Sequence, residues 1–228
     1  IQPSDIMEVK ASDPADASYT KIVANGKTEW IKVKNEKAAA FLETHRYAAY
    51  LGASMGFTKM EGTTVNAKDK KAYSALQNMQ SSMVAGNAAN VPGNGVSIPK
   101  QLKAGAVMAL NLRGGQKDTA GAAINSEWMP VDTKALLAGE DITADALGNT
   151  ANPNNIANPD NLKFSEKMRT LFIGEDSSQH VNNFLWAYNV DTKQLSRVMS
   201  VPAGGESTGL HAVDEINGWT YIMSNFQH

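Results

Sequence analysis

The strongest constraint on the fold is a repeated grouping of short strands in which an acidic residue opens each group. Glu61 precedes "GTTV", Asp160 precedes "NLKF" and Glu206 precedes "STGL". Asp160 and Glu206 lie 46 residues apart, which is close to the roughly 40 to 50 residues of a four-stranded propeller blade. The pattern predicts an all-β fold, a partial β-propeller of about two to three four-stranded antiparallel blades.

The interval between Glu61 and Asp160 is 99 residues, about twice the blade repeat. Two segments rich in Gly, Asn, Ser and Pro, residues 78–101 and 140–159, fall inside it. Because such composition is typical of loops, we interpret both segments as insertions that lengthen one blade. An additional blade would also fit the interval.

The amino-terminal part has a different pattern. Alternating apolar and polar residues flank Asn25-Gly26, which is the sequence signal of a β-hairpin. An alanine-rich stretch then predicts one helix near residues 36–51. We expect residues 1–42 to hold a partial blade hairpin and the start of this helix, and residues 43–228 to form an incomplete propeller. The final strand group stops after two strands, so we expect a fragment of a larger single domain whose amino-terminal blades are missing.

Charge and composition exclude several classes of partner. The formal net charge is −2 at pH 7, so there is no electrostatic basis for binding nucleic acid or an acidic membrane surface. No apolar run is long enough to span a bilayer. Cysteine is absent, and any metal ion must therefore use oxygen or histidine ligands.

The three opening acids are the first candidate site. In a propeller the first strand of each blade lines the central channel, so Glu61, Asp160 and Glu206 are expected to converge at one mouth of it. Carboxylates that share a partly buried site repel one another unless a cation compensates. Oxygen ligands gathered from separate strands suit Ca²⁺. The alternative is that each acid lies in solvent at the end of a loop, as most acids do.

Other polar residues are expected near the same mouth. The second strand of a blade returns toward it, and the segment "IGEDSSQHVNN" places Glu175, Asp176 and His180 there. These three are candidate ligands or substrate contacts, and a solvated turn is the simpler reading. Lys59 from the strand and Arg46 from the helix could place positively charged side chains at this mouth, and the alternative is that both are solvated. Three tryptophans are expected to pack between sheets, namely Trp128, Trp186 and Trp219.

A competing motif lies within the last strand group. Residues Gly205 to Gly209 satisfy G-x-S-x-G, the nucleophile elbow of serine hydrolases, and His211 and Asp214 follow. An elbow requires a helix after the serine, whereas the sequence here predicts a β-hairpin. We therefore assign Ser207 to a strand and give the functional role to Glu206.

Several blocks of the sequence resemble the PhoX-type alkaline phosphatases, a family of calcium- and iron-dependent phosphomonoesterases built on a β-propeller. The blocks are "ETHRYAAYLGA" with "FTKMEGTTVNAKDKKAYSAL", then "ANPDNLKF", and then "NNFLWAYNVDTKQLSRVMSVPAGGESTGL" with "YIMSNFQH". The resemblance runs from about Glu43 to the end of the chain. It implies a periplasmic or secreted parent protein whose export signal lies upstream.

The resemblance also implies roles for individual residues. Glu61, Asp160 and Glu206 correspond to metal ligands, and Lys59 stands where some relatives carry an arginine that faces the phosphate. The family's iron site uses a cysteine, which this chain lacks, so an iron site would be incomplete here. The implied activity is phosphomonoester hydrolysis by a metal cluster in the propeller channel, with little or no activity in the isolated fragment. The alternative is a non-enzymatic, calcium-stabilised propeller that binds a partner.

Overall fold

The computed structural model describes residues 2–24, 26–54, 56–90, 95–118 and 120–228. Its contacts divide the chain into two compact units. Unit 1 comprises Ile1–Phe57 and Gln80–Gln101, and unit 2 comprises Thr58–Met79 and Leu102–His228. The expected division at residues 42 and 43 concerns the parent domain and stays a prediction, whereas the boundary between these units falls at Phe57.

Unit 1 combines a small antiparallel sheet with short helices. Its elements are α1 (Pro3–Ile6), β1 (Met7–Lys10), β2 (Thr20–Ala24), β3 (Lys27–Val33), α2 (Glu36–Leu42), α3 (Thr44–Tyr50) and the 3-10 turn η1 (Ser81–Met83). The strand order is β1-β3-β2. The predicted hairpin is the β2–β3 pair; Asn25 lies outside the described residues, and Gly26 has the positive φ of 69° that such a turn needs.

The single helix expected near residues 36–51 is two helices. Glu43 leaves the helical region, with φ −133° and ψ 41°, and serves both as the end of α2 and as the residue before α3. Asn35 begins α2 by accepting a hydrogen bond from the Ala38 backbone through its side chain. Alanine content indicated helix over the whole stretch, and it could not reveal this one non-helical residue.

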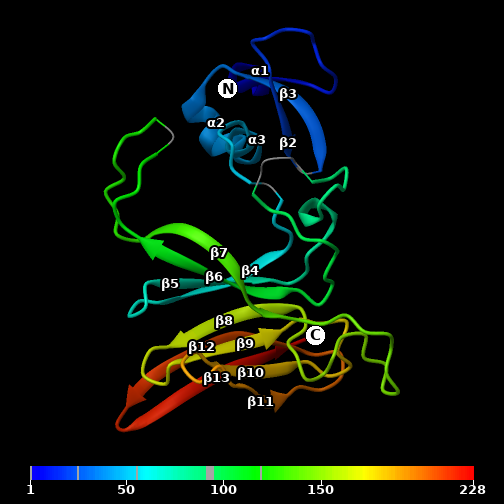
Figure 1. The fold of residues 1–228 in the computed structure, drawn as a ribbon, viewed down its shortest axis with the longest axis vertical. Helices are drawn as coiled ribbons and strands as arrows, with labels where there is room; N and C mark the ends of the chain where they lie inside the picture. The colour runs from blue at the N-terminus through cyan, green and yellow to red at the C-terminus, as the bar shows by residue number, and fades with distance from the viewer. Residues whose placement is uncertain (1, 25, 55, 91–94, 119) are drawn as a thin grey trace. The chain divides into compact units, whose positions relative to one another are not determined.

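Unit 2 is entirely β in its regular elements and confirms the predicted sheets. Two four-stranded antiparallel sheets are followed by a hairpin, and each sheet runs in chain order (Figure 1). The first sheet comprises β4 (Met60–Asn66), β5 (Lys71–Leu76), β6 (Ala106–Arg113) and β7 (Met129–Ala138). The second comprises β8 (Pro159–Ser165), β9 (Thr170–Glu175), β10 (Phe184–Asn189) and β11 (Leu195–Ser200). The hairpin is β12 (Glu206–Ile216) with β13 (Trp219–Gln227).

The two long polar segments are loops, as expected. One connects β5 to β6 and the other connects β7 to β8, and within the described ranges no further sheet lies between β4 and β8. The interval between the first two acids is therefore one blade with insertions. The G-x-S-x-G interpretation is excluded, since Ser207 is fully buried within strand β12 and β13 follows it.

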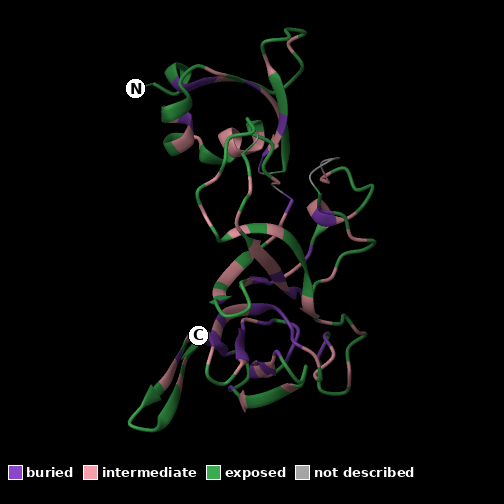
Figure 2. Ribbon diagram, turned by 60° about the vertical axis from the view of Figure 1, so that its left-hand side comes forward, coloured by how far each residue is buried: buried purple, intermediate pink, exposed green. Residues whose placement is uncertain are grey.

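The main core lies between the two four-stranded sheets. The first sheet contributes four buried side chains (Tyr73, Ala75, Val107 and Ala109), and the second contributes six (Leu162, Phe164, Leu171, Ile173, Trp186 and Tyr188). A smaller cluster containing Phe172, Leu185 and Ala212 joins the second sheet to the hairpin. Figure 2 shows that the hairpin, which ends at the C-terminus, is mostly exposed.

Trp186 packs in this core as predicted, at 2% exposure, but the other two tryptophans do not. Trp128 is 46% exposed and Trp219 is 71% exposed. Trp128 precedes β7 and Trp219 begins β13, and neither belongs to a core between sheets among the described residues. The sequence could show that the residues were aromatic and lay beside or within strands, but not that a covering sheet was lacking.

Two glycines allow the sheets to approach closely. A Cβ atom added at Gly62 in β4 would lie 2.5 Å from the Asp160 carbonyl oxygen and 2.7 Å from the Leu162 nitrogen in β8. A Cβ atom added at Gly174 in β9 would lie 2.2 Å from the Ser207 carbonyl oxygen in β12. The first contact joins β4 to β8, and the second joins β9 to β12. Strand β8 also packs against β12, so β4, β8 and β12, called here the first strands, lie side by side.

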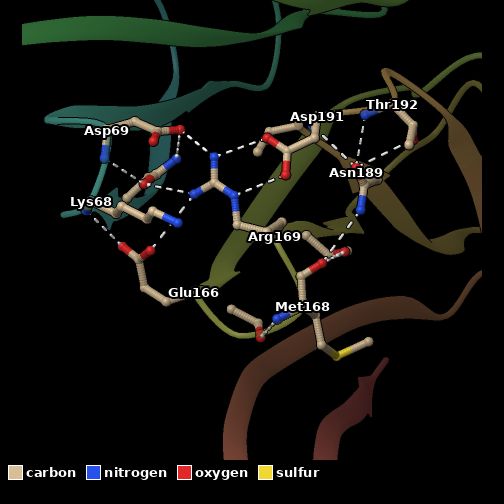
Figure 3. A network of polar contacts seen from close by, with 12 residues as sticks. Lys68, Asp69, Glu166, Met168, Arg169, Asn189, Asp191 and Thr192 are labelled. Carbon is tan, nitrogen blue, oxygen red and sulfur yellow. Dashed lines mark hydrogen bonds and ion pairs between the residues drawn. The ribbon is translucent and has the colours of Figure 1, made fainter.

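At the other end of the first strands a polar network joins the two four-stranded sheets (Figure 3). Arg169, in the β8–β9 turn, donates to both carboxylate oxygens of Asp191 at 3.0 Å and to Asp69 of the β4–β5 turn at 2.5 Å. The Lys68 backbone nitrogen donates to Glu166 at 3.1 Å. We call these five residues the Arg169 network.

No helix among the described residues is both long enough and apolar enough to cross a bilayer.

Candidate functional site

The three opening acids stand at equivalent positions of the first strands. Glu61 is the second residue of β4, Asp160 is the second residue of β8, and Glu206 is the first residue of β12. Because β8 packs against both β4 and β12, the acidic ends lie at the same end of unit 2. The sequence expectation that the three acids begin equivalent strands is confirmed.

A fourth acid belongs to the same group. Asp176 follows the last residue of β9, and its charge raises the pKa of Asp160 and of Glu206. We call Glu61, Asp160, Asp176 and Glu206 the acidic cluster. Strand β9 runs antiparallel to β8, so its end returns to the acidic end of β8, as the sequence predicted.

Two members of the acidic cluster, Asp160 and Glu206, lie in surroundings that disfavour their charged forms. Burial, and then the neighbouring Glu61 carboxylate, raise the pKa of Asp160 above its ordinary value. Burial, followed by Asp176 and Asp160, raises the pKa of Glu206. Both groups therefore hold their protons more tightly in the folded chain than in the unfolded one, and a bound cation would relieve the repulsion.

Lys59 is the nearest compensating charge. Its ammonium lies 3.0 Å from a Glu61 carboxylate oxygen, and this hydrogen bond raises the pKa of Lys59. The Lys59 backbone has φ +47°, and its carbonyl accepts a hydrogen bond from the Gln77 nitrogen at 2.9 Å. The side chain is half exposed to solvent.

Two asparagines and a glutamine hold the acids in place, and none of them was among the predicted site residues. Gln77 donates to an Asp176 carboxylate oxygen at 2.8 Å. Asn158 donates to the carbonyls of Gln77 and Lys103, both at 2.8 Å, and so ties the end of β5 to the start of β8. Asn161 donates to Asp160 at 2.5 Å. Asn158 and Asn161 flank Asp160 in the motif "NPDN", which is the sequence signal that could have identified them.

Glu175 and His180 are in a different environment from the one expected. Both side chains are completely buried, and the Glu175 carboxylate accepts from the Trp186 indole at 2.6 Å and from the Ala157 and Phe184 nitrogens at 2.8 and 2.9 Å. It also lies 3.0 Å from Nδ1 of His180. This pattern organises the loop after β9, and it leaves Asp176 as the member of that segment that belongs to the acidic cluster.

Arg46 is engaged within unit 1. Its guanidinium forms two hydrogen bonds with Glu29, at 2.7 and 3.1 Å, and one with Glu43 at 2.7 Å. These bonds raise the pKa of Arg46 further above its already high value. Arg46 belongs to unit 1, and its role as a substrate contact stays a prediction.

The acidic cluster suits a hard cation by chemistry more than by geometry. Its donors are carboxylate oxygens, which are the ligands that Ca²⁺ prefers. Among the described residues, however, no three His, Asp or Glu side chains are grouped closely enough to hold a metal ion. An iron site of the kind that the resemblance implies does not fit this chain alone, because the chain has no cysteine.

The sheets of unit 2 and their shared acidic end define a partial, propeller-like β fold. A solved structure of Pseudomonas fluorescens PhoX in complex with vanadate, a transition state analogue, is similar to this chain with a TM-score of 0.52 and 19% sequence identity. The similarity covers 90% of this chain and 36% of that chain. At this identity it establishes a PhoX-like fold. No protein-family model and no curated protein matches the sequence.

Proposed function

We propose that this chain is part of a PhoX-like phosphatase and that the acidic cluster contributes to the metal-dependent hydrolysis of phosphomonoesters. The observation that carries the proposal is the gathering of Glu61, Asp160 and Glu206 at the same end of three adjacent strands of a PhoX-like fold. The chain spans 36% of the PhoX chain. The remaining blades, and any iron ligands, are assigned to other parts of the parent protein.

The residues of this chain have distinct roles in the proposed site. Asp160 and Glu206, whose pKa values are raised by burial and by neighbouring carboxylates, would act as ligands of a cation that relieves this repulsion. Engagement of Glu61 by a cation would free Lys59 to bind a phosphate oxygen as a point charge. Bound calcium would neutralise charge on the phosphoryl group. Gln77 would keep Asp176 directed toward the same space through its 2.8 Å hydrogen bond.

The test uses the whole parent protein and a generic phosphomonoester. We expect hydrolysis to fall at least about 100-fold on chelation of divalent cations and in the Glu61→Gln and Asp160→Asn variants. The matched control is Glu127→Gln, because Glu127 is an exposed acid in unit 2 that lies outside the acidic cluster. Unchanged hydrolysis in the Glu61 and Asp160 variants would remove these residues from the site. Residues 1–228 alone are expected to show little or no activity.

A second candidate is a non-enzymatic propeller scaffold that calcium stabilises. It is favoured by the pairing of Lys59 with Glu61 at 3.0 Å, which leaves the lysine engaged within the chain. In this case calcium would raise the melting temperature of the parent protein, and phosphomonoester hydrolysis would not exceed the uncatalysed rate. The periplasmic or secreted location that the resemblance implies is common to both proposals.

A further inference from the structure

The turns that lead into the three opening acids share one backbone feature. The residue two positions before each acid has a positive φ, which is 47° at Lys59, 45° at Asn158 and 80° at Gly204. This left-handed conformation is uncommon for residues other than glycine, so its recurrence at three equivalent positions shows that each first strand is entered in a similar way. We call the two residues before each acid its lead-in segment, and the position of an acid depends on how its lead-in segment is held.

Four buried, uncharged residues connect the three lead-in segments. None of them is more than 7% exposed. One lies directly after β5, one directly before β8, one in the turn after β9 and one directly before β10. We call these residues the polar chain, and they are Gln77, Asn158, Ser177 and Asn183.

The first half of the polar chain joins the lead-in segments of Glu61 and Asp160. The Gln77 backbone nitrogen donates to the Lys59 carbonyl at 2.9 Å. The Asn158 side-chain nitrogen in turn donates to the Gln77 carbonyl at 2.8 Å. Two hydrogen bonds thus connect the segments that precede the first two acids.

The second half continues from Asn158 to the lead-in segment of Glu206. The Ser177 hydroxyl donates to Oδ1 of Asn158 at 2.7 Å, and the Ser177 backbone nitrogen donates to Oδ1 of Asn183 at 2.8 Å. The Asn183 side-chain nitrogen then donates to the Gly205 carbonyl at 2.6 Å. The polar chain therefore runs without interruption past all three first strands.

Both asparagine side chains are bonded through the amide oxygen and the amide nitrogen. Asn158 also donates to the Lys103 carbonyl at 2.8 Å. Because these groups are buried, removal of either side chain leaves backbone carbonyls without a partner, and the surrounding segments have to shift to satisfy them. The polar chain carries no charge, so it can fix the acids in place without neutralising them.

We propose that Asn158 and Asn183 are positioning residues that set the mutual spacing of Glu61, Asp160 and Glu206 through the polar chain. Hydrogen-bonded groups behind the ligands of a metal ion commonly act in this way. The consequence of this spacing for calcium rests on the function proposed above, whereas the spacing itself rests on the hydrogen bonds alone.

Crystal structures of the calcium-free parent protein test the positioning directly. In Asn158→Gly, which retains the positive φ, and in Asn183→Ala, we expect the three carboxylates to move relative to one another by at least about 0.5 Å. Asn149→Ala is the matched control. Asn149 is also a buried asparagine of unit 2, but its side chain bonds only to Asp145 and to the Val181 nitrogen. Its removal should leave the carboxylates in place.

Calcium affinity, measured by isothermal titration calorimetry, separates positioning from a merely structural role. We expect the dissociation constant to rise at least tenfold in Asn158→Gly and Asn183→Ala. It should not change in Asn149→Ala, even where all three variants have lower melting temperatures. If Asn183→Ala does not fold, Ser177→Ala replaces it, because this change interrupts the polar chain by removing one hydroxyl.

The two measurements distinguish this inference from the proposed function. Unmoved carboxylates would overturn the positioning, and so would an affinity equal to that of the control in a protein that binds calcium. An unaltered parent protein that binds no calcium would remove the proposed function, while displaced carboxylates in the variants would still support the positioning.

Discussion

The two ends of the first strands differ in how their charges are paired. At one end Arg169 is bonded to Asp69 and Asp191, and these contacts lower the pKa of both acids. At the other end the acidic cluster has one lysine, and burial and repulsion raise the pKa of Asp160 and Glu206. The Arg169 network is thus complete without a ligand, whereas the acidic cluster is an arrangement that a cation would complete. Functional sites are often placed where charge is left uncompensated.

The largest expected effect comes from separating the strands that carry the acidic cluster. Gly62→Ala would place a methyl group 2.5 Å from the Asp160 carbonyl oxygen, and the strands would have to move apart. We expect the free energy of unfolding to fall by about 1–3 kcal/mol, measured by urea denaturation. Gly114→Ala is the control, because the three atoms nearest to its methyl group would all belong to the movable carboxylate of Glu127. Equal stability of the two variants would contradict the close approach.

The Arg169 network offers the next test. Arg169→Met should lower the free energy of unfolding by about 1 kcal/mol, since the network is partly exposed to solvent. Asp69 and Asp191 have lowered pKa values, so their contribution is present above their ordinary pKa and is lost as the pH falls through the lowered value. As the pH is lowered, the melting temperature of the variant should therefore fall less than that of the unaltered chain.

A control for this test is Arg113→Met, which removes an exposed arginine that has no ion pair among those identified in the described residues. It should leave the pH dependence of the melting temperature unchanged. If Arg169→Met retained the full acid sensitivity of the unaltered chain, the network would not be its source.

The smallest expected effect is on the stability of a variant in the acidic cluster, and it is not a loss of stability. In the absence of divalent cations, Asp160→Asn should leave the stability at pH 7 unchanged or raise it by less than about 1 kcal/mol. The raised pKa of Asp160 means that its protonated form favours folding below the ordinary pKa, and this contribution is lost as the pH rises through the raised value. Differential scanning calorimetry at pH 4 and pH 8 would measure the difference.

The response to calcium also distinguishes the acidic cluster from the Arg169 network. Added Ca²⁺ should raise the melting temperature of the unaltered chain more at pH 8 than at pH 4, because protons compete for the carboxylates at low pH. The Asp160→Asn variant should lose most of this increase, while Arg169→Met should retain it. An equal response of the two variants would show that calcium acts outside the acidic cluster.

The sequence was sufficient to predict the sheets, because alternation and the recurring acids are local signals. The equivalent positions of Glu61, Asp160 and Glu206 followed from that repeat. The functions of Glu175 and His180 did not, since only the fold shows that Trp186 and two backbone nitrogens already satisfy this carboxylate. Asp176 lies next to Glu175 in the sequence, and burial alone separates their roles.

The contacts between sheets were equally hidden from the sequence. Gln77 and Asp176 are 99 residues apart and are joined by one side-chain hydrogen bond. Arg169 and Asp69 are 100 residues apart. Such pairings depend on how adjacent sheets are stacked, and strand periodicity carries no information on stacking.

The contact at Gly62 has a consequence for how this molecule can change over time. The main chain at Gly62 touches the main chain of β8 because glycine has no side chain. This contact sets the spacing between the main chains that carry Glu61 and Asp160. Substitutions at other positions can alter which cation or anion binds at the acidic end of the first strands. The distance between β4 and β8 at this point can change only if Gly62 itself is replaced.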